Sequence, residues 1–105
     1  MPLPGIEWDE EKARINLATH QVSFETAQYI FSDSERLERP DRSAGNLSGE
    51  ERLQTLGMVN EVLFVVYTER GENSRLISAR RANKAERRSY NGYYHIDGKS
   101  WTKAV

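Results

Sequence analysis

One change in hydrophobic period divides this 105-residue chain and limits the folds open to it. Up to about residue 34 the apolar side chains recur every three or four positions, the spacing of helices that bury one face. From Arg52 onward they alternate with polar residues or run continuously, as they do in β-strands. Helices followed by consecutive strands predict an α+β fold, because a parallel sheet would require strands and helices in alternation.

Two helices are expected in the N-terminal part. The first follows a short extended segment at 6–8, begins at the capping residue Asp9 and should end near His20. The second begins at the capping residue Ser23 and should end at 33–34. The side chains expected to pack these helices against the sheet are Leu17, Phe24, Ala27 and Phe31.

Three strands and a third helix complete the predicted architecture. The strand-like runs are 52–58, 61–69 and 74–81, and the short turns between them favour an antiparallel meander. The middle run is apolar on both faces, so we expect it at the sheet centre. The third helix should begin at Asn83, where Asn-Lys-Ala-Glu is a capping-box sequence, and stop before Gly92.

The rest of the chain adds no second domain and no familiar catalytic motif. Residues 40–50 are rich in glycine, serine and charge and indicate a loop too short to separate domains, so 1–105 is interpreted as one domain. There is no cysteine, no phosphate-binding glycine loop, no pair of metal-spaced histidines and no nucleophile elbow. We therefore expect neither a bound metal nor an organic cofactor.

The sequence also lacks the marks of a membrane or secretory segment. The longest apolar run, Val62 to Tyr67, is too short to span a bilayer. The N-terminus lacks the charged start and apolar stretch of a signal peptide. A cytoplasmic protein without membrane contact is the expectation.

The net charge of −1 conceals two oppositely charged parts. Residues 1–69 carry 6 Lys or Arg against 13 Asp or Glu, and residues 70–105 carry 9 against 3, which gives local charges of −7 and +6. A concentrated basic segment attracts phosphate and indicates contact with nucleic acid. The alternative is that the basic part neutralises the acidic part inside one fold.

Six basic residues surround the junction between the last predicted strand and the last predicted helix: Arg75, Arg80, Arg81, Lys84, Arg87 and Arg88. Strict alternation places Arg75 and Arg81 on one face of the strand and Arg80 on the other. Since one face is the core, one of the two adjacent arginines needs a specific partner, either an acidic residue of the N-terminal helices or a phosphate. The other three form a ridge on the helix.

Two further side chains are candidates for proton transfer. His20 is the better of the two histidines for general acid or base work, because imidazole exchanges protons near neutral pH, but it also suits the end of a helix. Lys12, Asn16 and His20 recur every four residues and form a polar line along the first helix. Tyr90 is a candidate for stacking on an unpaired base or for proton transfer, the alternative being a packed core edge.

RNA cleavage is the chemistry that best fits these residues, because the substrate brings its own nucleophile, the 2′-hydroxyl. The enzyme then has to position the strand, stabilise charge on the phosphate and transfer protons. We predict a metal-independent endoribonuclease. Its catalytic residues are expected to be His20, Arg80, Arg81, Arg87 and Tyr90, and its RNA-binding residues Lys12, Arg75, Lys84 and Arg88. The alternatives are a non-catalytic module that binds RNA or protein, and arginines that pair with carboxylates inside the fold.

An ordered series of short motifs connects the chain to a known family. The series consists of Trp8-Asp9, Lys12, Asn16, His20, Val22-Ser23-Phe24, Ala27, Phe31, Gly49-Glu50-Glu51-Arg52, the run Val-Val-Tyr-Thr-Glu-Arg-Gly at 65–71, the run Leu-Ile-Ser-Ala-Arg-Arg-Ala at 76–82, Glu86-Arg87 and Tyr90. Over residues 6–91 the chain resembles the BrnT family of toxins, and residues 92–105 form a C-terminal extension. The chain departs from the family pattern at Thr19, Gln21 and Asn83, where lysine, glycine and threonine are usual.

This resemblance implies a RelE-like ribonuclease fold and a bacterial type II toxin–antitoxin system. It implies a toxin that cleaves RNA and reduces growth, and a BrnA-like antitoxin that neutralises it. The antitoxin would bind the operator, so the toxin would meet DNA only through its partner. The expected assembly is a dimer of toxin–antitoxin heterodimers.

Overall fold

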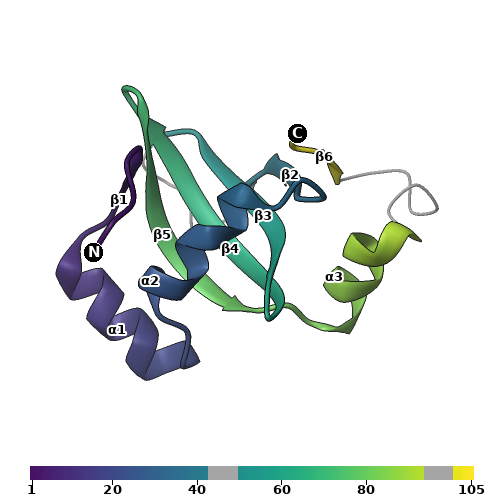
Figure 1. Ribbon diagram of the computed structural model, residues 1–105, viewed down its shortest axis with the longest axis horizontal. Coiled ribbons are helices and arrows are strands. Elements are labelled where there is room, and N and C mark those ends of the chain that lie inside the picture. Colours follow the sequence, from purple (N-terminus) through teal and green to yellow (C-terminus); the bar gives the residue numbers. More distant parts are fainter. Residues whose placement is uncertain (43–49, 94–100) are drawn as a thin grey trace.

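A curved, mixed sheet organises the computed structural model, which describes residues 1–42, 50–93 and 101–105 (Figure 1). The N-terminal elements are β1 (Ile6–Glu7), α1 (Glu10–His20), α2 (Phe24–Ala27), the 3-10 helix η1 (Gln28–Ser32) and β2 (Leu37–Pro40). They are followed by β3 (Arg52–Val59), β4 (Glu61–Arg70), β5 (Asn73–Arg81), α3 (Lys84–Arg88), the π-helical turn η2 (Ser89–Tyr93) and β6 (Thr102–Lys103). The predicted α+β class is confirmed.

The strands lie in the order β1-β5-β4-β3-β2-β6. The predicted meander of β3, β4 and β5 is confirmed, and β4 lies inside the sheet with every residue from Val62 to Thr68 buried. Two short strands, β2 and β6, were not predicted and pair antiparallel at one edge, while β1 lies in the predicted extended segment at 6–8 and pairs parallel with β5 at the other edge. The sheet is therefore not purely antiparallel. Of the predicted loop at 40–50, residues 43–49 lie outside the described residues.

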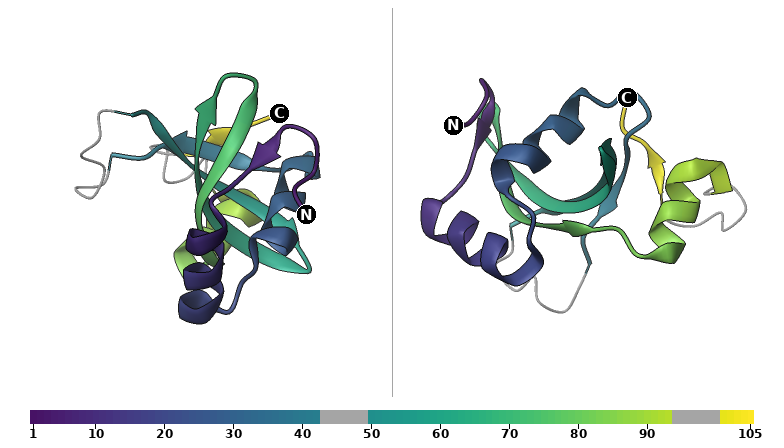
Figure 2. Two further views of the ribbon diagram at one scale, coloured as in Figure 1. Left: turned by 90° about the vertical axis from the view of Figure 1, so that its left-hand side faces the viewer. Right: turned by 60° about the horizontal axis from the view of Figure 1, so that its bottom comes forward.

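The N-terminal helices cover one face of this sheet. Figure 2 shows α2 and η1 on one side of the curved strands and α3 beyond the end of β5. Phe24 and Ala27 are fully buried and Phe31 is partly buried against the core, as predicted. The predicted packing of Leu17 is wrong, because this side chain is 50% exposed. The single predicted second helix is in fact a short α-helix continued as a 3-10 helix.

A buried asparagine, Asn16, explains why Leu17 faces outward. The Asn16 amide nitrogen donates to the carbonyl oxygens of Ala79 and Val22, at 2.9 Å each, and its oxygen accepts from the Ala79 N–H at 3.0 Å. These bonds turn the Asn16 side of α1 toward β5. Asn16 thereby continues the pairing of β5 past the end of β1.

The opposite face carries a second apolar cluster and the C-terminal elements. Trp101 and Ala82 pack there with residues of β2, β3 and β4, and Tyr90 lies against the cluster. The predicted capping box of α3 is confirmed, because Asn83 and Glu86 exchange both bonds at 2.8 Å. Gly92 has a positive φ of 108°, as expected where the last helical turn ends. No helix within the described ranges is long and apolar enough to cross a membrane.

Candidate functional site

Four arginines lie on the sheet face that is opposite α2 and η1. Residues directly opposite one another on paired strands share a face. One cross-strand row is Arg80, Phe64, Leu56 and Leu37, the next is Ser78, Val66, Gln54 and Arg39, and the third is Arg75, Thr68 and Arg52. We call the set Arg39, Arg52, Arg75 and Arg80 the arginine face.

The position of Arg75 corrects the sequence prediction. Alternation had placed Arg75 with Arg81 and opposite Arg80, but the pairing of β4 with β5 shifts between Val66 and Tyr67. Such a bulge adds one residue to a strand and reverses the alternation beyond it. Arg75 therefore shares the face of Arg80, where it forms an ion pair with Glu7 at 2.7 Å.

Arg80 has the specific partner that the sequence required for one of the adjacent arginines. Its two terminal nitrogens donate to the two carboxylate oxygens of Glu86, each at 2.9 Å, and its guanidinium lies 4.0 Å above the centre of the Phe64 ring. The partner thus belongs to α3 and not to the N-terminal helices. The Glu86 side chain is only 10% exposed, whereas that of Arg80 is 36% exposed, and one Arg80 terminal nitrogen also donates to the Arg81 carbonyl oxygen at 3.1 Å.

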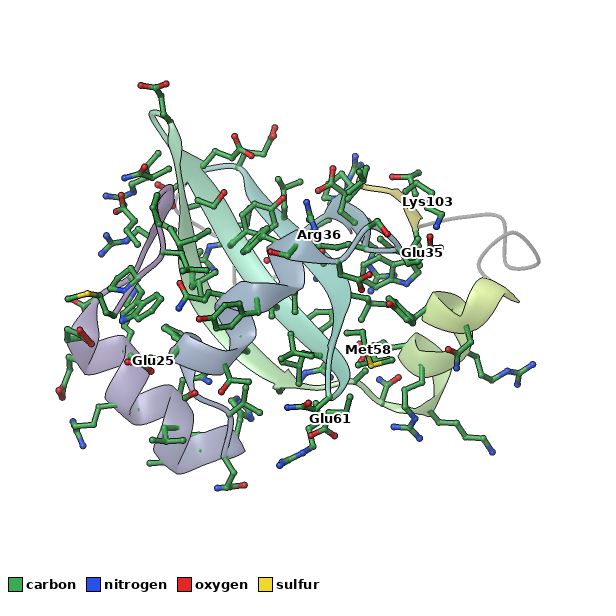
Figure 3. The ribbon with its side chains drawn as sticks, in the orientation of Figure 1. Glu25, Glu35, Arg36, Met58, Glu61 and Lys103 are labelled. Atoms are coloured by element: carbon green, nitrogen blue, oxygen red, sulfur yellow. The ribbon has the colours of Figure 1, made fainter. Side chains whose placement is uncertain are left out.

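Arg81 lies on the other face, as predicted relative to Arg80. Its Nε donates to Glu61 at 3.0 Å and one terminal nitrogen reaches the carbonyl oxygen of His20 at 3.5 Å. Figure 3 shows Glu61 where β4 begins, at the lower end of the sheet. Both Arg80 and Arg81 are paired with carboxylates, but Arg81 is 53% exposed, so the buried pairs that a purely structural role requires are not present.

The remaining predicted residues of the C-terminal helix are distributed around it. Arg87 donates to the Ala82 carbonyl oxygen at 2.8 Å, and Lys84 and Arg88 are exposed. Tyr90 donates its hydroxyl to Asp33 at 2.5 Å and lies against the apolar cluster that contains Phe64. Within the described residues, no hydrogen bond joins Arg80 to Arg87 or Tyr90.

The contact between Tyr90 and Asp33 changes the acidity of both groups. Burial opposes ionisation of Asp33, but hydrogen bonds from Tyr90 and from the backbone N–H groups of Glu35 and Met58 bring its pKa below the ordinary value. Burial, and then the bond to Asp33, raise the pKa of Tyr90. The phenol of Tyr90 is thus protonated at neutral pH and bound as a donor.

A groove of about 300 Å³ brings His20 and Lys12 together. The predicted polar line of α1 forms one wall, and Ile77 and Ser78 of β5 form the other. Of that line, Asn16 is committed to the backbone bonds described above, which leaves His20 and Lys12 as its functional candidates. Ser78 also belongs to the row next to Arg80, so the groove adjoins the arginine face.

Sequence reasoning missed Arg39, Arg52 and Gln54. Arg39 lies over the Trp101 ring, with its guanidinium 4.0 Å from the ring centre, and donates to Gln54 at 2.7 Å. The alternation in β3 could have placed Arg52 and Gln54 on one face. No signal could have placed Arg39 beside them, because the four-residue strand β2 has no readable period. Within the described residues, no group of acidic or histidine side chains could hold a metal ion.

Comparison with known proteins identifies the family and shows a similar fold. The model of the family described as "Ribonuclease toxin, BrnT, of type II toxin-antitoxin system" matches residues 8–86. The 1.1 Å crystal structure of the Brucella abortus ribonuclease toxin BrnT is similar, with a TM-score of 0.53, 24% identity, and coverage of 75% of this chain and 96% of that chain. No curated protein sequence gives a significant match. At this identity the structural similarity shows the fold alone, but the family match extends over most of the chain: this protein belongs to the BrnT family of ribonuclease toxins of type II toxin–antitoxin systems.

Proposed function

We propose that this protein is a metal-independent endoribonuclease of RelE-like fold that cleaves cytoplasmic RNA and inhibits growth. The observation that carries the proposal is the arginine face. It includes the partly exposed side chain of Arg80, which shares a strand face with Ser78, and Ser78 lines the groove that contains His20. A planar guanidinium suits a phosphate, and imidazole suits proton transfer.

The proposed reaction needs only groups that RNA and this chain supply. The 2′-hydroxyl attacks the adjacent phosphorus as His20 accepts its proton, the bond to the 5′-oxygen breaks, and the proton passes from His20 to the leaving 5′-oxygen. Arg80 stabilises the negative charge that grows on the phosphoryl oxygens, and a charge that grows in the transition state is where such a group accelerates the reaction. The products are a 2′,3′-cyclic phosphate and a 5′-hydroxyl.

The other predicted residues have supporting roles in this proposal. Lys12, which lines the groove, and Arg75, which belongs to the arginine face, bind the RNA backbone, while Lys84 and Arg88 attract the strand to α3. Arg81, Arg87 and Tyr90 are proposed as further phosphate and stacking contacts. At present Arg81 donates to Glu61, Arg87 to the Ala82 carbonyl oxygen and Tyr90 to Asp33.

Family membership implies an antitoxin partner. We propose that it is BrnA-like, that it covers the basic surface, and that two toxin–antitoxin heterodimers assemble through it, with operator DNA bound by the antitoxin alone.

A second candidate function is non-catalytic binding of RNA or protein. The pairing of Arg80 with Glu86 favours this alternative, since the cation is already neutralised.

Cleavage assays with antitoxin-free protein distinguish the two functions. Single-stranded RNA should be cut in the presence of a chelator, and the upstream fragment should end in a 2′,3′-cyclic phosphate. A requirement for Mg²⁺ together with 3′-hydroxyl ends would refute the mechanism, and RNA that stays intact would favour the binding module.

Any substitution of Arg80 also removes the ion-pair partner of Glu86. Arg80→Ala alone leaves Glu86 buried without a counter-ion, which typically costs about 3–5 kcal/mol of stability. The double variant Arg80→Gln/Glu86→Gln removes both charges and should lower cleavage at least about tenfold, or about 1.4 kcal/mol of barrier. Arg81→Ala, at an exposed pair, should lower it similarly. Arg14→Gln, which breaks only an exposed pair on α1, is the control and should cleave normally.

A further inference from the structure

Two arginines of the arginine face have incompletely satisfied guanidinium groups. The Nε of Arg52 is buried and has no hydrogen-bond partner among the described residues. Arg39 bonds to Gln54 through its Nε, and no bond from its terminal nitrogens to another described residue is present. Burial lowers the pKa of Arg39 against the opposing charges of Glu86 and Asp41. A bound anion would compensate both guanidinium groups.

Side chains from β3 and from the C-terminal segment hold Arg39 in place. Gln54 accepts from Arg39 through its oxygen and donates through its nitrogen to Asp41 at 2.9 Å, which fixes the amide in one orientation. Trp101 supports the guanidinium from below, and its ring meets Phe64 edge-on at 6.4 Å between centres. The Arg80 guanidinium in turn lies over the Phe64 ring. The two guanidinium groups therefore rest on two aromatic rings that touch.

Trp101 occupies this position because the chain returns to the sheet at its C-terminus. Directly after Trp101, β6 pairs with β2 through Glu38–Thr102 and Leu37–Lys103 (Figure 1). Lys103 bonds to Glu35 at 2.6 Å, and Figure 3 shows these two side chains together beside β6. This segment lies outside the family match, which ends at residue 86.

The distance across the sheet determines what kind of anion fits. The backbones of Arg80 on β5 and Arg39 on β2 are three strands apart, roughly 14 Å at the usual spacing of paired strands, but both guanidinium groups lie over the adjoining Phe64 and Trp101 rings between them. A strand with a phosphate at every nucleotide can place one phosphate at each guanidinium group, and an irregular acidic peptide has no such repeat.

We propose that Arg39 and Arg52 form a second phosphate-binding subsite for single-stranded RNA, beside the phosphate held at Arg80. Trp101 and Gln54 are positioning residues for Arg39. The subsite rests on the proposed function only in taking the same RNA as its ligand.

Binding of an uncleavable probe tests the subsite without reference to catalysis. The probe is a fully 2′-O-methylated RNA of about twelve nucleotides, within the range of single-strand binding sites, and the readout is fluorescence anisotropy over a series of salt concentrations. Loss of one phosphate contact reduces the slope of log K against log salt by about 0.7. Arg39→Gln and Arg52→Gln should each show this reduction. Arg14→Gln, which removes the same charge from α1, should leave the slope unchanged.

A two-nucleotide version of the probe separates local from general effects. It has a single phosphodiester group, which Arg80 binds in the proposed reaction, so its affinity should be equal in wild type and in both variants. With a cleavable long RNA, Arg39→Gln should raise KM and leave kcat unchanged. If Arg39→Gln lowers the melting temperature, Arg39→Met keeps a flexible stem over Trp101 and removes only the charged group.

The outcomes distinguish the proposed subsite from the proposed endoribonuclease activity. A wild type that binds the long probe with the Arg39-dependent slope but cuts no RNA supports the subsite and overturns the nuclease. A wild type that cuts RNA while Arg39→Gln and Arg52→Gln keep the full slope overturns the subsite. The subsite is also overturned if the wild type binds no probe, or if the variants weaken only the binding of an acidic peptide.

Discussion

At the C-terminal end of α1 the backbone turns through Gln21, whose φ of 57° and ψ of 30° lie in the left-handed region. Its N–H still closes the helix by donating to the Leu17 carbonyl oxygen at 2.9 Å. This backbone conformation is strained for residues with a Cβ and is unstrained for glycine. The sequence comparison had identified Gln21 as a position where glycine is usual, and the backbone gives the physical reason.

Replacing Gln21 with glycine should therefore stabilise the protein. We expect Gln21→Gly to raise the free energy of unfolding by about 0.5–1 kcal/mol, measured by urea denaturation, because relief of strain exceeds the added freedom of the unfolded chain. Gln21→Ala is the matched control, since it removes the same side chain and keeps the Cβ. Equal stabilities of the two variants would show that the turn is not strained.

At the scale of elements, η1 approaches β3 more closely than a side chain on Gly57 would allow. A Cβ built on Gly57 would lie 2.6 Å from the Cβ of Ile30, a fully buried residue of η1. Because that contact involves atoms next to the backbone, no side-chain rotation relieves it.

Gly57→Ala should lower the free energy of unfolding by about 1–3 kcal/mol, the usual cost of overpacking a core. The measurement is again denaturation, with Met58→Ala at the neighbouring, partly exposed position as the control. A Gly57→Ala variant as stable as wild type would mean that η1 can lift from the sheet without cost.

The elements also show where sequence reasoning works. Helix caps, the three long strands and the capping box depend on neighbours in the chain, and these were predicted to within one or two residues. The two- to four-residue strands have no readable period, so β2 and with it Arg39 were missed. The bulge in β5 displaced Arg75, and the polar bonds of Asn16 placed Leu17 in solvent against its apolar character.

At the scale of the whole molecule, the acidic and basic parts of the chain do meet. Ion pairs join Glu7 to Arg75, Glu61 to Arg81 and Glu35 to Lys103 across the fold. The neutralisation considered for the sequence is therefore present. Arg80 is different because its partner Glu86 belongs to the same basic part.

The link between Asp33 and Tyr90 makes stability depend on pH. The carboxyl of Asp33 has a folded pKa below its ordinary value of 3.8, so its contribution to stability is present above pH 3.8 and is lost as the pH falls through the folded pKa. The hydroxyl of Tyr90 is one cause of that lowered pKa. Tyr90→Phe should therefore weaken the loss of stability in acid, measured as unfolding free energy below and above pH 3.8.

Tyr29→Phe is the control for this measurement, because Tyr29 is half exposed. It should reproduce the acid profile of the wild type. At neutral pH Tyr90→Phe should also be less stable by about 1.5–3 kcal/mol, the usual worth of a hydrogen bond to a charged group. An unchanged acid profile would mean that Asp33 keeps its low pKa without the phenol.

The amide of Asn16 has a consequence for association between copies. An open strand edge is a template on which another chain can add a strand, and proteins cover such edges to avoid aggregation. On β5 the short β1 covers Ser74 and Arg75, and the Asn16 side chain occupies both backbone groups of Ala79. Beyond β1, the edge of β5 therefore lies against a helix, and two molecules cannot join edge to edge at Ala79 without first displacing α1.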